Sequence, residues 1–187
     1  MPGKLLPMTL SGLHYPVIGC EVDGDIRAQR AAMQALLYSA GWPQPKKESN
    51  GRPRMGREFC SLSHGGGWAL AVRHSGPIGA DVEAASERLF NVVPRFCGEL
   101  DQPVLDHFGS SLDTLCRLWT AKEAVFKAFG TGVDFLTGIE WTGVHDDGAR
   151  IMATQQQRPL HIHWRSLGCT PGGLPVWMAV AFSADRT

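Results

Sequence analysis

The strongest constraint on the fold is one long helical pattern in a chain whose other apolar runs are mostly short. Residues 113–129 (DTLCRLWTAKEAVFKAF) have the spacing of an α-helix, with Asp113 at their start. Gly130 and Gly132 follow directly, as is typical where a helix ends. We therefore expect one well-formed helix here, combined with the shorter strand-like runs on both sides of it.

Those other runs predict a second helix near the N-terminus and several strands. Residues 25–40 have helical spacing, and Asp25 is a suitable N-cap. Residues 43–57 resemble a polar loop, and residues 84–111 a broken helical pattern followed by a loop or short helix. Strands are expected at 13–22, 58–62, 67–73, 77–83, 139–145, 149–154, 159–165 and 175–183. This order of elements predicts an α+β protein of two similar lobes.

Size and composition exclude several classes of protein. The 187 residues suffice for one domain or two small lobes, which need no disulfide or metal merely to fold. Lysine plus arginine number 18, as do aspartate plus glutamate, which argues against a broad nucleic-acid-binding surface. The five irregularly spaced cysteines predict neither a disulfide framework nor a zinc site. Without a signal-peptide core or an apolar run of about 20 residues, we expect a cytoplasmic protein that is not inserted in a membrane.

One face of the long helix carries residues that suit either a surface ion pair or a site. Trp119, Glu123 and Lys127 are spaced i, i+4, i+8 and therefore lie on the same side of the helix. Taken alone, the helix favours a surface ion pair that contributes about 0.2–0.5 kcal/mol.

A second acidic group stands in the predicted strand 77–83. Asp81 and Glu83 are spaced i, i+2 and point to the same side of an extended strand, where two carboxylates repel each other unless a positive charge lies between them. Their apolar neighbours indicate partial burial, and hard oxygen ligands suit Mg²⁺ or Mn²⁺. The alternative is that the two acids simply begin a solvated loop.

Two further groups suit phosphate binding, although each also has a plainer interpretation. The segment 61–67 (SLSHGGG) offers hydroxyls, an imidazole and glycine N–H groups, or is simply a flexible hairpin turn. Arginines are concentrated on the predicted helix 25–40 and in the loop 43–57, where most of them are expected to be solvated.

Taken in order, these motifs resemble the 4′-phosphopantetheinyl transferase family of the Sfp-like kind. The chain has GRP at 51–53, SLSH at 61–64, IGADVE at 78–83 and WTAKEAVFK at 119–127. The family has a G-[KR]-P step, an LSHS-like turn, a G-x-D-x-E strand and a W-x-x-K-E-[AS]-x-x-K helix. The separation of 42 positions between Asp81 and Glu123 also fits the family. The close resemblance covers roughly residues 50 to 132.

The resemblance implies a reaction and a metal site. The family transfers the phosphopantetheine arm of coenzyme A to a serine of an acyl or peptidyl carrier protein and releases adenosine 3′,5′-bisphosphate. By similarity, Asp81, Glu83 and Glu123 would hold Mg²⁺, with Mn²⁺ as a substitute, against the pyrophosphate of coenzyme A. Lys127 would neutralise the charge that develops on the bridging oxygen. Glu123 would act as metal ligand, as acceptor of the serine proton, or as both.

The resemblance also implies contacts to the rest of coenzyme A. Ser63 and His64 resemble the family's contacts to the 3′-phosphate side, and Arg52 resembles the basic residue near the adenine. Arg30, with Arg27 as second choice, resembles the helix arginine that meets the 3′-phosphate. Lys122 points away from the face of Glu123, and we expect it to meet the edge of the pyrophosphate or the carrier protein. The chain departs from the family in its shorter N-terminus and in having LSHG in place of LSHS.

By resemblance, the expected fold is a pseudo-dimer of two α/β lobes with coenzyme A in the cleft between them. We place the lobes at residues 1–75 and 76–187. A single chain with both lobes would complete its own cleft, so a monomer is expected, and the resemblance favours a role in secondary metabolism. The carrier would dock near the mouth of the site, for which Phe90, Phe96 and Phe108 are candidates, although core packing is the more ordinary role for each.

Three other functions fit parts of the sequence. They are a non-catalytic coenzyme A-binding partner protein, a metal-dependent phosphohydrolase that uses the same carboxylates with water, and a structural α+β domain that binds neither ligand. The intact acidic residues and Lys127 argue against the first. His161 and His163 form an i, i+2 pair on a predicted strand and lack a third metal ligand at useful spacing, so we expect a packed or solvent-facing pair.

Overall fold

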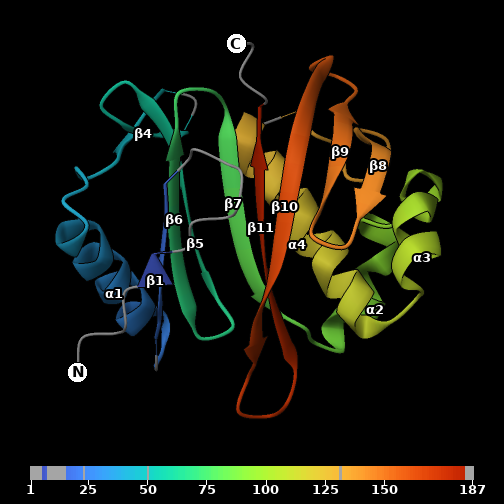
Figure 1. Ribbon diagram of the computed structural model, residues 1–187, viewed down its shortest axis with the longest axis horizontal. Helices are drawn as coiled ribbons and strands as arrows, with labels where there is room; N and C mark the ends of the chain where they lie inside the picture. Colours follow the sequence, from blue (N-terminus) through green and yellow to red (C-terminus); the bar gives the residue numbers. More distant parts are fainter. Residues whose placement is uncertain (1–5, 8–15, 23, 50, 131, 184–187) are drawn as a thin grey trace.

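The computed structural model describes residues 6–7, 16–22, 24–49, 51–130 and 132–183, and two antiparallel sheets form its centre (Figure 1). The first sheet has the strand order β1-β2-β6-β5-β4-β3 and the second the order β7-β11-β10-β9-β8. The strands of the first sheet are β1 (Leu6–Pro7), β2 (Val17–Glu21), β3 (Lys46–Lys47), β4 (Pro53–Met55), β5 (Glu58–Gly65) and β6 (Trp68–His74). Those of the second are β7 (Ile78–Ala84), β8 (Ile139–His145), β9 (Gly148–Ala153), β10 (Arg158–Cys169) and β11 (Pro175–Phe182).

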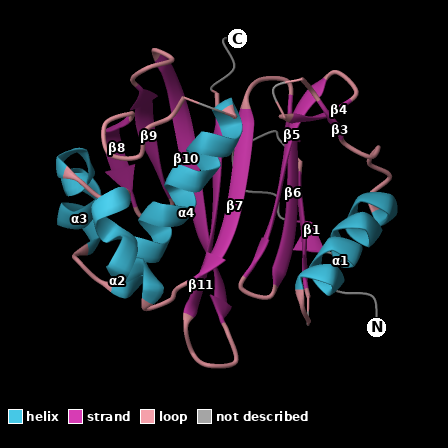
Figure 2. Ribbon diagram, turned by 180° about the vertical axis from the view of Figure 1, so that it is seen from behind, coloured by secondary structure: helices cyan, strands magenta, loops and turns pink. Residues whose placement is uncertain are grey.

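Helix α1 (Ile26–Ser39) covers the outer face of the first sheet, and α4 (Leu112–Phe129) with two shorter helices covers that of the second (Figure 2). Helix α1 begins at Asp25, whose side chain accepts hydrogen bonds from two backbone N–H groups of the first turn, and it packs Met33, Leu36 and Leu37 on the first sheet. Helix α4 is the long predicted helix and packs on β7 and β11 of the second sheet. The sheets pack face to face between these two helices, through apolar side chains of β6, β7 and β11.

The pattern of β7 separates a core face from a site face. Ile78, Ala80 and Val82 point into the core between the sheets, so Asp81 and Glu83 point to the opposite face, toward α4. Gly79 lies on that same face, directly beneath the helix. A Cβ added there would lie only 2.0 Å from the carbonyl oxygen of Ala124. The absence of a side chain at Gly79 therefore lets α4 approach β7 closely.

The structure confirms the α+β class and most of the expected elements, with several differences. The short strand β1 was not expected, and residues 13–15 of the predicted strand 13–22 lie outside the described residues. The predicted loop 43–57 contains the short strands β3 and β4. The segment between the acidic motifs folds into α2 (Arg88–Val92), the 3₁₀ turns η1 (Val93–Arg95) and η2 (Glu99–Asp101), and α3 (Gln102–Phe108). Helix α4 begins at Leu112, one residue before the predicted start, and Ser111 caps it with a hydroxyl that accepts a hydrogen bond from Thr114 N.

The chain passes from the first sheet to the second between His74 and Ile78. The division into lobes at residues 1–75 and 76–187 remains a prediction. Among the described residues, no helix has both the length and the apolar character needed to cross a membrane.

Candidate functional site

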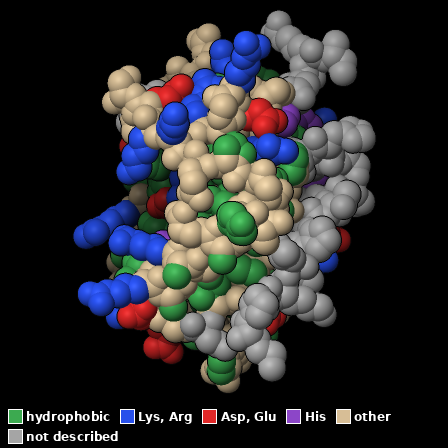
Figure 3. Space-filling view, turned by 90° about the vertical axis from the view of Figure 1, so that its left-hand side faces the viewer, with side chains coloured by type: hydrophobic (Ala, Val, Ile, Leu, Met, Phe, Trp, Pro, Cys, Tyr) green, Lys and Arg blue, Asp and Glu red, His purple; other side chains and the backbone are tan. Residues whose placement is uncertain are grey.

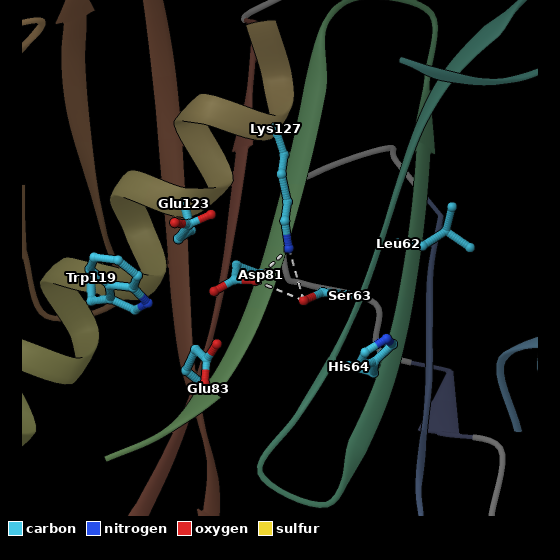
Figure 4. A pocket seen from close by; sticks show the side chains of 8 residues that line it. All are labelled: Leu62, Ser63, His64, Asp81, Glu83, Trp119, Glu123 and Lys127. Carbon is cyan, nitrogen blue, oxygen red and sulfur yellow. Dashed lines mark hydrogen bonds and ion pairs between the residues drawn. The ribbon is translucent and has the colours of Figure 1, made fainter. Parts of the chain in front are cut away.

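A pocket of about 280 Å³ lies where β5, β7 and α4 meet (Figure 4). Strand β7 contributes two acidic side chains, and α4 contributes an indole, a carboxylate and an amine. Strand β5 forms the opposite wall. The lining residues are Leu62, Ser63, His64, Asp81, Glu83, Trp119, Glu123 and Lys127.

Two simple periodicities bring these side chains together. On β7, Asp81 and Glu83 share the face toward α4 because they are two positions apart. On α4, Trp119, Glu123 and Lys127 are spaced by four residues and line the same pocket. The predicted association of the two acidic motifs is therefore present in the geometry, and the helix face that resembled a surface ion pair lines a pocket.

Lys127 and Ser63 both bond to one oxygen of Asp81 (Figure 4). Asp81 is 3% exposed, and its Oδ1 lies 2.5 Å from Lys127 Nζ and 2.7 Å from Ser63 Oγ. Lys127 Nζ also donates to Ser63 Oγ at 3.0 Å. The other oxygen, Oδ2, is buried and has no hydrogen-bond partner among the described residues.

The pocket holds more negative than positive charge. Burial, reinforced by the charge of Asp81, raises the pKa of Glu83 to about 7. The same two causes, in the same order, raise the pKa of Glu123. Lys127 opposes both shifts and is the one lysine or arginine among the eight lining residues. The carboxylates would be stabilised by an additional cation.

This donor set fits a hard divalent cation. Three carboxylates offer oxygen ligands, and Asp81 Oδ2 is a buried acceptor without a donor among the described residues. Burial, followed by repulsion from Asp81, raises the pKa values of Glu83 and Glu123, so a bound cation would stabilise their charged forms. As the side chains stand, with Lys127 on Asp81, the described residues contain no group of three acidic, histidine or cysteine side chains placed to hold a metal ion together.

A second cavity of about 340 Å³ adjoins the first, because Leu62 and Lys127 line both. It is the more apolar of the two in character, with Pro53 and Phe126 in its wall. Arg52 also lines it. The guanidinium of Arg52 donates to the carbonyl of Ala128 near the C-terminal end of α4, where helix carbonyls attract positive charge. The predicted ligand contact Arg52 thus lies beside a cavity and bridges the first sheet to α4.

The position of Lys122 differs from the predicted one. We expected its amine to meet the pyrophosphate or the carrier, but Lys122 is fully buried. Its Nζ lies 2.6 Å from Asp101 Oδ1 and also donates to the carbonyl oxygens of Phe96 and Phe135. Helix geometry turns Lys122 away from Glu123 toward the core, where it ties α4 to two neighbouring segments.

The predicted contacts outside the two acidic motifs fall into two groups. Ser63 and His64 line the pocket, although the hydroxyl of Ser63 is engaged with Asp81 and Lys127. Arg30 and Arg27 are exposed on α1 and line neither cavity. Figure 3 shows lysine and arginine side chains gathered along one edge of the face on which α1 lies.

Sequence reasoning did not single out Leu62 and Phe126, which line the second cavity. Leu62 stands inside the SLSH segment. Phe126 lies three residues after Glu123, and this spacing places Glu123 and Phe126 on neighbouring parts of one helix face.

Of the proposed docking phenylalanines, Phe96 is fully buried and Phe108 packs against the core, whereas Phe90 is exposed. His161 and His163 both pack against the ring of Phe182.

Comparison with known proteins finds similarity over the part of the chain that contains β7 and α4. A sequence profile of the 4′-phosphopantetheinyl transferase superfamily matches residues 77–176, which include β7 and α4. The 4′-phosphopantetheinyl transferase ffp of Bacillus subtilis is 26% identical over 98 residues, or 51% of this chain and 44% of that protein. The 4′-phosphopantetheinyl transferase gsp of Aneurinibacillus migulanus is 24% identical over 121 residues, or 63% of this chain and 51% of that protein. Another 4′-phosphopantetheinyl transferase of Bacillus subtilis is 28% identical over 90 residues, or 47% of this chain and 40% of that protein. The alignments thus span about half or less of these relatives.

Proposed function

Because the chain belongs to the 4′-phosphopantetheinyl transferase superfamily, we propose that it transfers the phosphopantetheine arm of coenzyme A to a serine of an apo acyl or peptidyl carrier protein. The second product is adenosine 3′,5′-bisphosphate. The observation that carries this proposal is the convergence of Asp81, Glu83, Glu123 and Lys127 on one pocket that continues into a second cavity.

In this proposal, coenzyme A lies along the two adjoining cavities. The pyrophosphate lies near Lys127, which both cavities share, and the adenosine end lies in the second cavity beside Arg52 and Phe126. The helix-on-sheet arrangement that α1 and α4 repeat supports a pseudo-dimer with the ligand between its halves. One chain supplies all of these walls, which supports action as a monomer.

The carboxylates have two tasks in the proposed mechanism. Asp81, Glu83 and Glu123 would hold Mg²⁺, which when bound neutralises charge on the pyrophosphate. The serine Oγ of the carrier forms a bond to the β-phosphorus, and the bond from that phosphorus to the bridging oxygen breaks. Glu123 accepts the serine proton, a task that its raised pKa suits. Lys127 donates a hydrogen bond to the leaving phosphate and stabilises its new negative charge.

The proposal is tested by mass spectrometry of a carrier protein. Incubation of the protein with coenzyme A, Mg²⁺ and an apo carrier should add the mass of the phosphopantetheine arm to the carrier. Glu123→Gln should abolish the gain, and Lys127→Ala should reduce it strongly. Glu140→Gln, at an exposed carboxylate of β8, is the matched control and should leave the gain unchanged.

Two results would refute the transferase. Absence of any gain on fatty acid, polyketide and peptide carriers, with coenzyme A still bound, would favour the non-catalytic partner protein. Release of adenosine 3′,5′-bisphosphate without a carrier would instead favour the phosphohydrolase.

A further inference from the structure

Two serine hydroxyls join the edges of the two sheets. The pairing of β4 with β5 stops at Phe59, so the rest of β5 is an edge of the first sheet that lies along β7, the edge of the second. Ser61 Oγ accepts from Ala80 N at 3.0 Å, and Ser63 Oγ accepts from Val82 N at 3.3 Å. Side-chain oxygens thus take the place of the carbonyl groups that a regular ladder would supply.

The two serines differ in what else they bond. Ser61 Oγ donates to the carbonyl oxygen of Ala80 at 3.4 Å, so its bonds stay within the backbone of β7. Ser63 Oγ instead donates to Asp81 Oδ1 at 2.7 Å and accepts from Lys127 Nζ at 3.0 Å. A hydroxyl has one proton and two lone pairs, so the hydrogen-bonding capacity of Ser63 is filled.

We propose that Ser63 is a positioning residue that orients Asp81 and Lys127 through one shared hydroxyl. The kinetic part of this inference rests on the proposed transferase function. With Oδ1 of Asp81 held by Ser63 and Lys127, Oδ2 is the carboxylate oxygen left for a ligand. Since β5, β7 and α4 meet at this hydroxyl, the packing of the two sheets is linked directly to the geometry of the site.

A double-mutant cycle without metal or coenzyme A tests the linkage. Ser63→Ala and Ser61→Ala are each made in the wild-type and in the Lys127→Met background, and the unfolding equilibrium constant is measured in urea. The effect of Ser61→Ala should be the same in both backgrounds, because its hydroxyl does not touch the amine. The effect of Ser63→Ala should differ by about fivefold or more between them. Agreement within about twofold would overturn the proposal.

Kinetics separate positioning from substrate contact. A positioning role predicts that Ser63→Ala lowers kcat for carrier modification about tenfold or more, with KM for coenzyme A changed less than about twofold. A higher KM with unchanged kcat would show that Ser63 binds coenzyme A and would overturn the proposal. Thr120→Ala removes a buried hydroxyl that donates to the carbonyl oxygen of Cys116 in the same helix, and it should leave both constants unchanged.

The tests remain informative if one variant or the proposed function fails. If Ser63→Ala does not fold, Ser63→Thr and Ser63→Val provide a pair of equal shape, which suits a strand, in which only the first keeps the hydroxyl. The effect of Lys127→Met on stability should differ by about fivefold or more between the Thr variant and the Val variant, because only the Thr hydroxyl can contact the amine. An equal effect in the two variants would overturn the proposal. If the wild-type protein modifies no carrier, the transferase proposal fails, whereas the metal-free cycle still decides the role of Ser63.

Discussion

Replacement of Lys122 by methionine is the sharpest test of how the structure departs from the sequence-based prediction. The side chains of Lys122 and Asp101 are both fully buried, and their charged atoms lie 2.6 Å apart. Asp101 also accepts hydrogen bonds from Trp141 Nε1 and from the backbone N–H of Gly98. Lys122→Met preserves much of the apolar stem but removes the amine, so a buried carboxylate is left without its cation.

The expected cost follows from the burial of both partners. Removal of one member of a fully buried ion pair costs about 3–5 kcal/mol, because the remaining charge stays out of water. The loss is a large share of the total stability of a single domain, which is about 5–15 kcal/mol. The double variant Lys122→Met with Asp101→Asn leaves neither charge, so its cost should be smaller than the sum of the two single costs.

Urea unfolding measures the stability, and calorimetric titration of the folded variant measures its affinity for coenzyme A. We expect the loss of stability given above, with the coenzyme A Kd within about twofold of the wild-type value, a factor that corresponds to about 0.4 kcal/mol. The opposite result is a stability loss below about 1 kcal/mol together with a Kd at least tenfold higher, which would show that Lys122 reaches the ligand and that its buried position is wrong.

Three further variants test the packing, the charges and the pH dependence of the molecule. Gly79→Ala places a Cβ 2.0 Å from the carbonyl oxygen of Ala124, so α4 must move. The free energy of unfolding in urea should fall by about 3 kcal/mol or more. Gly143→Ala, whose Cβ would have its nearest contact at 3.7 Å, is the control and should lower it by under about 1 kcal/mol. Lys127→Met should tighten Mn²⁺ binding to the metal-free protein about tenfold by calorimetry, since it removes the cation that competes for the carboxylates; unchanged affinity would contradict the charge argument. Burial lowers the pKa of His163 from its usual value near 6.5, so the unfolded chain binds the proton more tightly and stability falls as the pH falls through and below 6.5. His163→Gln should reduce that fall between pH 7.5 and 5.5, and an equal fall would contradict it.

Local periodicity predicted which side chains of the site share a face better than it predicted which residues those side chains contact. The i, i+2 spacing of Asp81 and Glu83 and the i+4 steps on α4 identify side chains that share a face, whatever the tertiary structure. The same helix geometry turns Lys122 away from Glu123, but it does not tell whether that side is solvent or core. The side of α4 that carries Lys122 is core because the 3₁₀ turn that ends at Asp101 packs against it. The broken pattern at 84–111 did not predict this turn.

The interactions that the sequence could not predict join residues far apart in the chain. Ser63 and Asp81 are 18 positions apart, and Ser63 and Lys127 are 64 apart. The glycine turn after Ser63 suggested a phosphate contact, because serine and histidine in such a turn are free to bind an anion. In the structure, β5 is paired along its length with β6, and the adjacent edge of β7 takes up the hydroxyl. Sheet-to-sheet packing, which has no local signal, therefore supplies the hydrogen-bond partners of Ser63 that the sequence could not predict.

The charges of the pocket bear on the choice between its proposed functions. Asp81, Glu83 and Glu123 face a single lysine, and burial together with mutual repulsion raises the pKa values of the two glutamates. A pyrophosphate that entered this pocket alone would add negative charge to a site with three carboxylates and one lysine, and in a poorly solvated pocket this repulsion is screened weakly. Coenzyme A binding should therefore be coupled to cation binding, each raising the affinity for the other. If coenzyme A binds as proposed, three carboxylates beside its phosphates weaken simple storage of the ligand, whereas an enzyme that holds a cation against a leaving phosphate requires them.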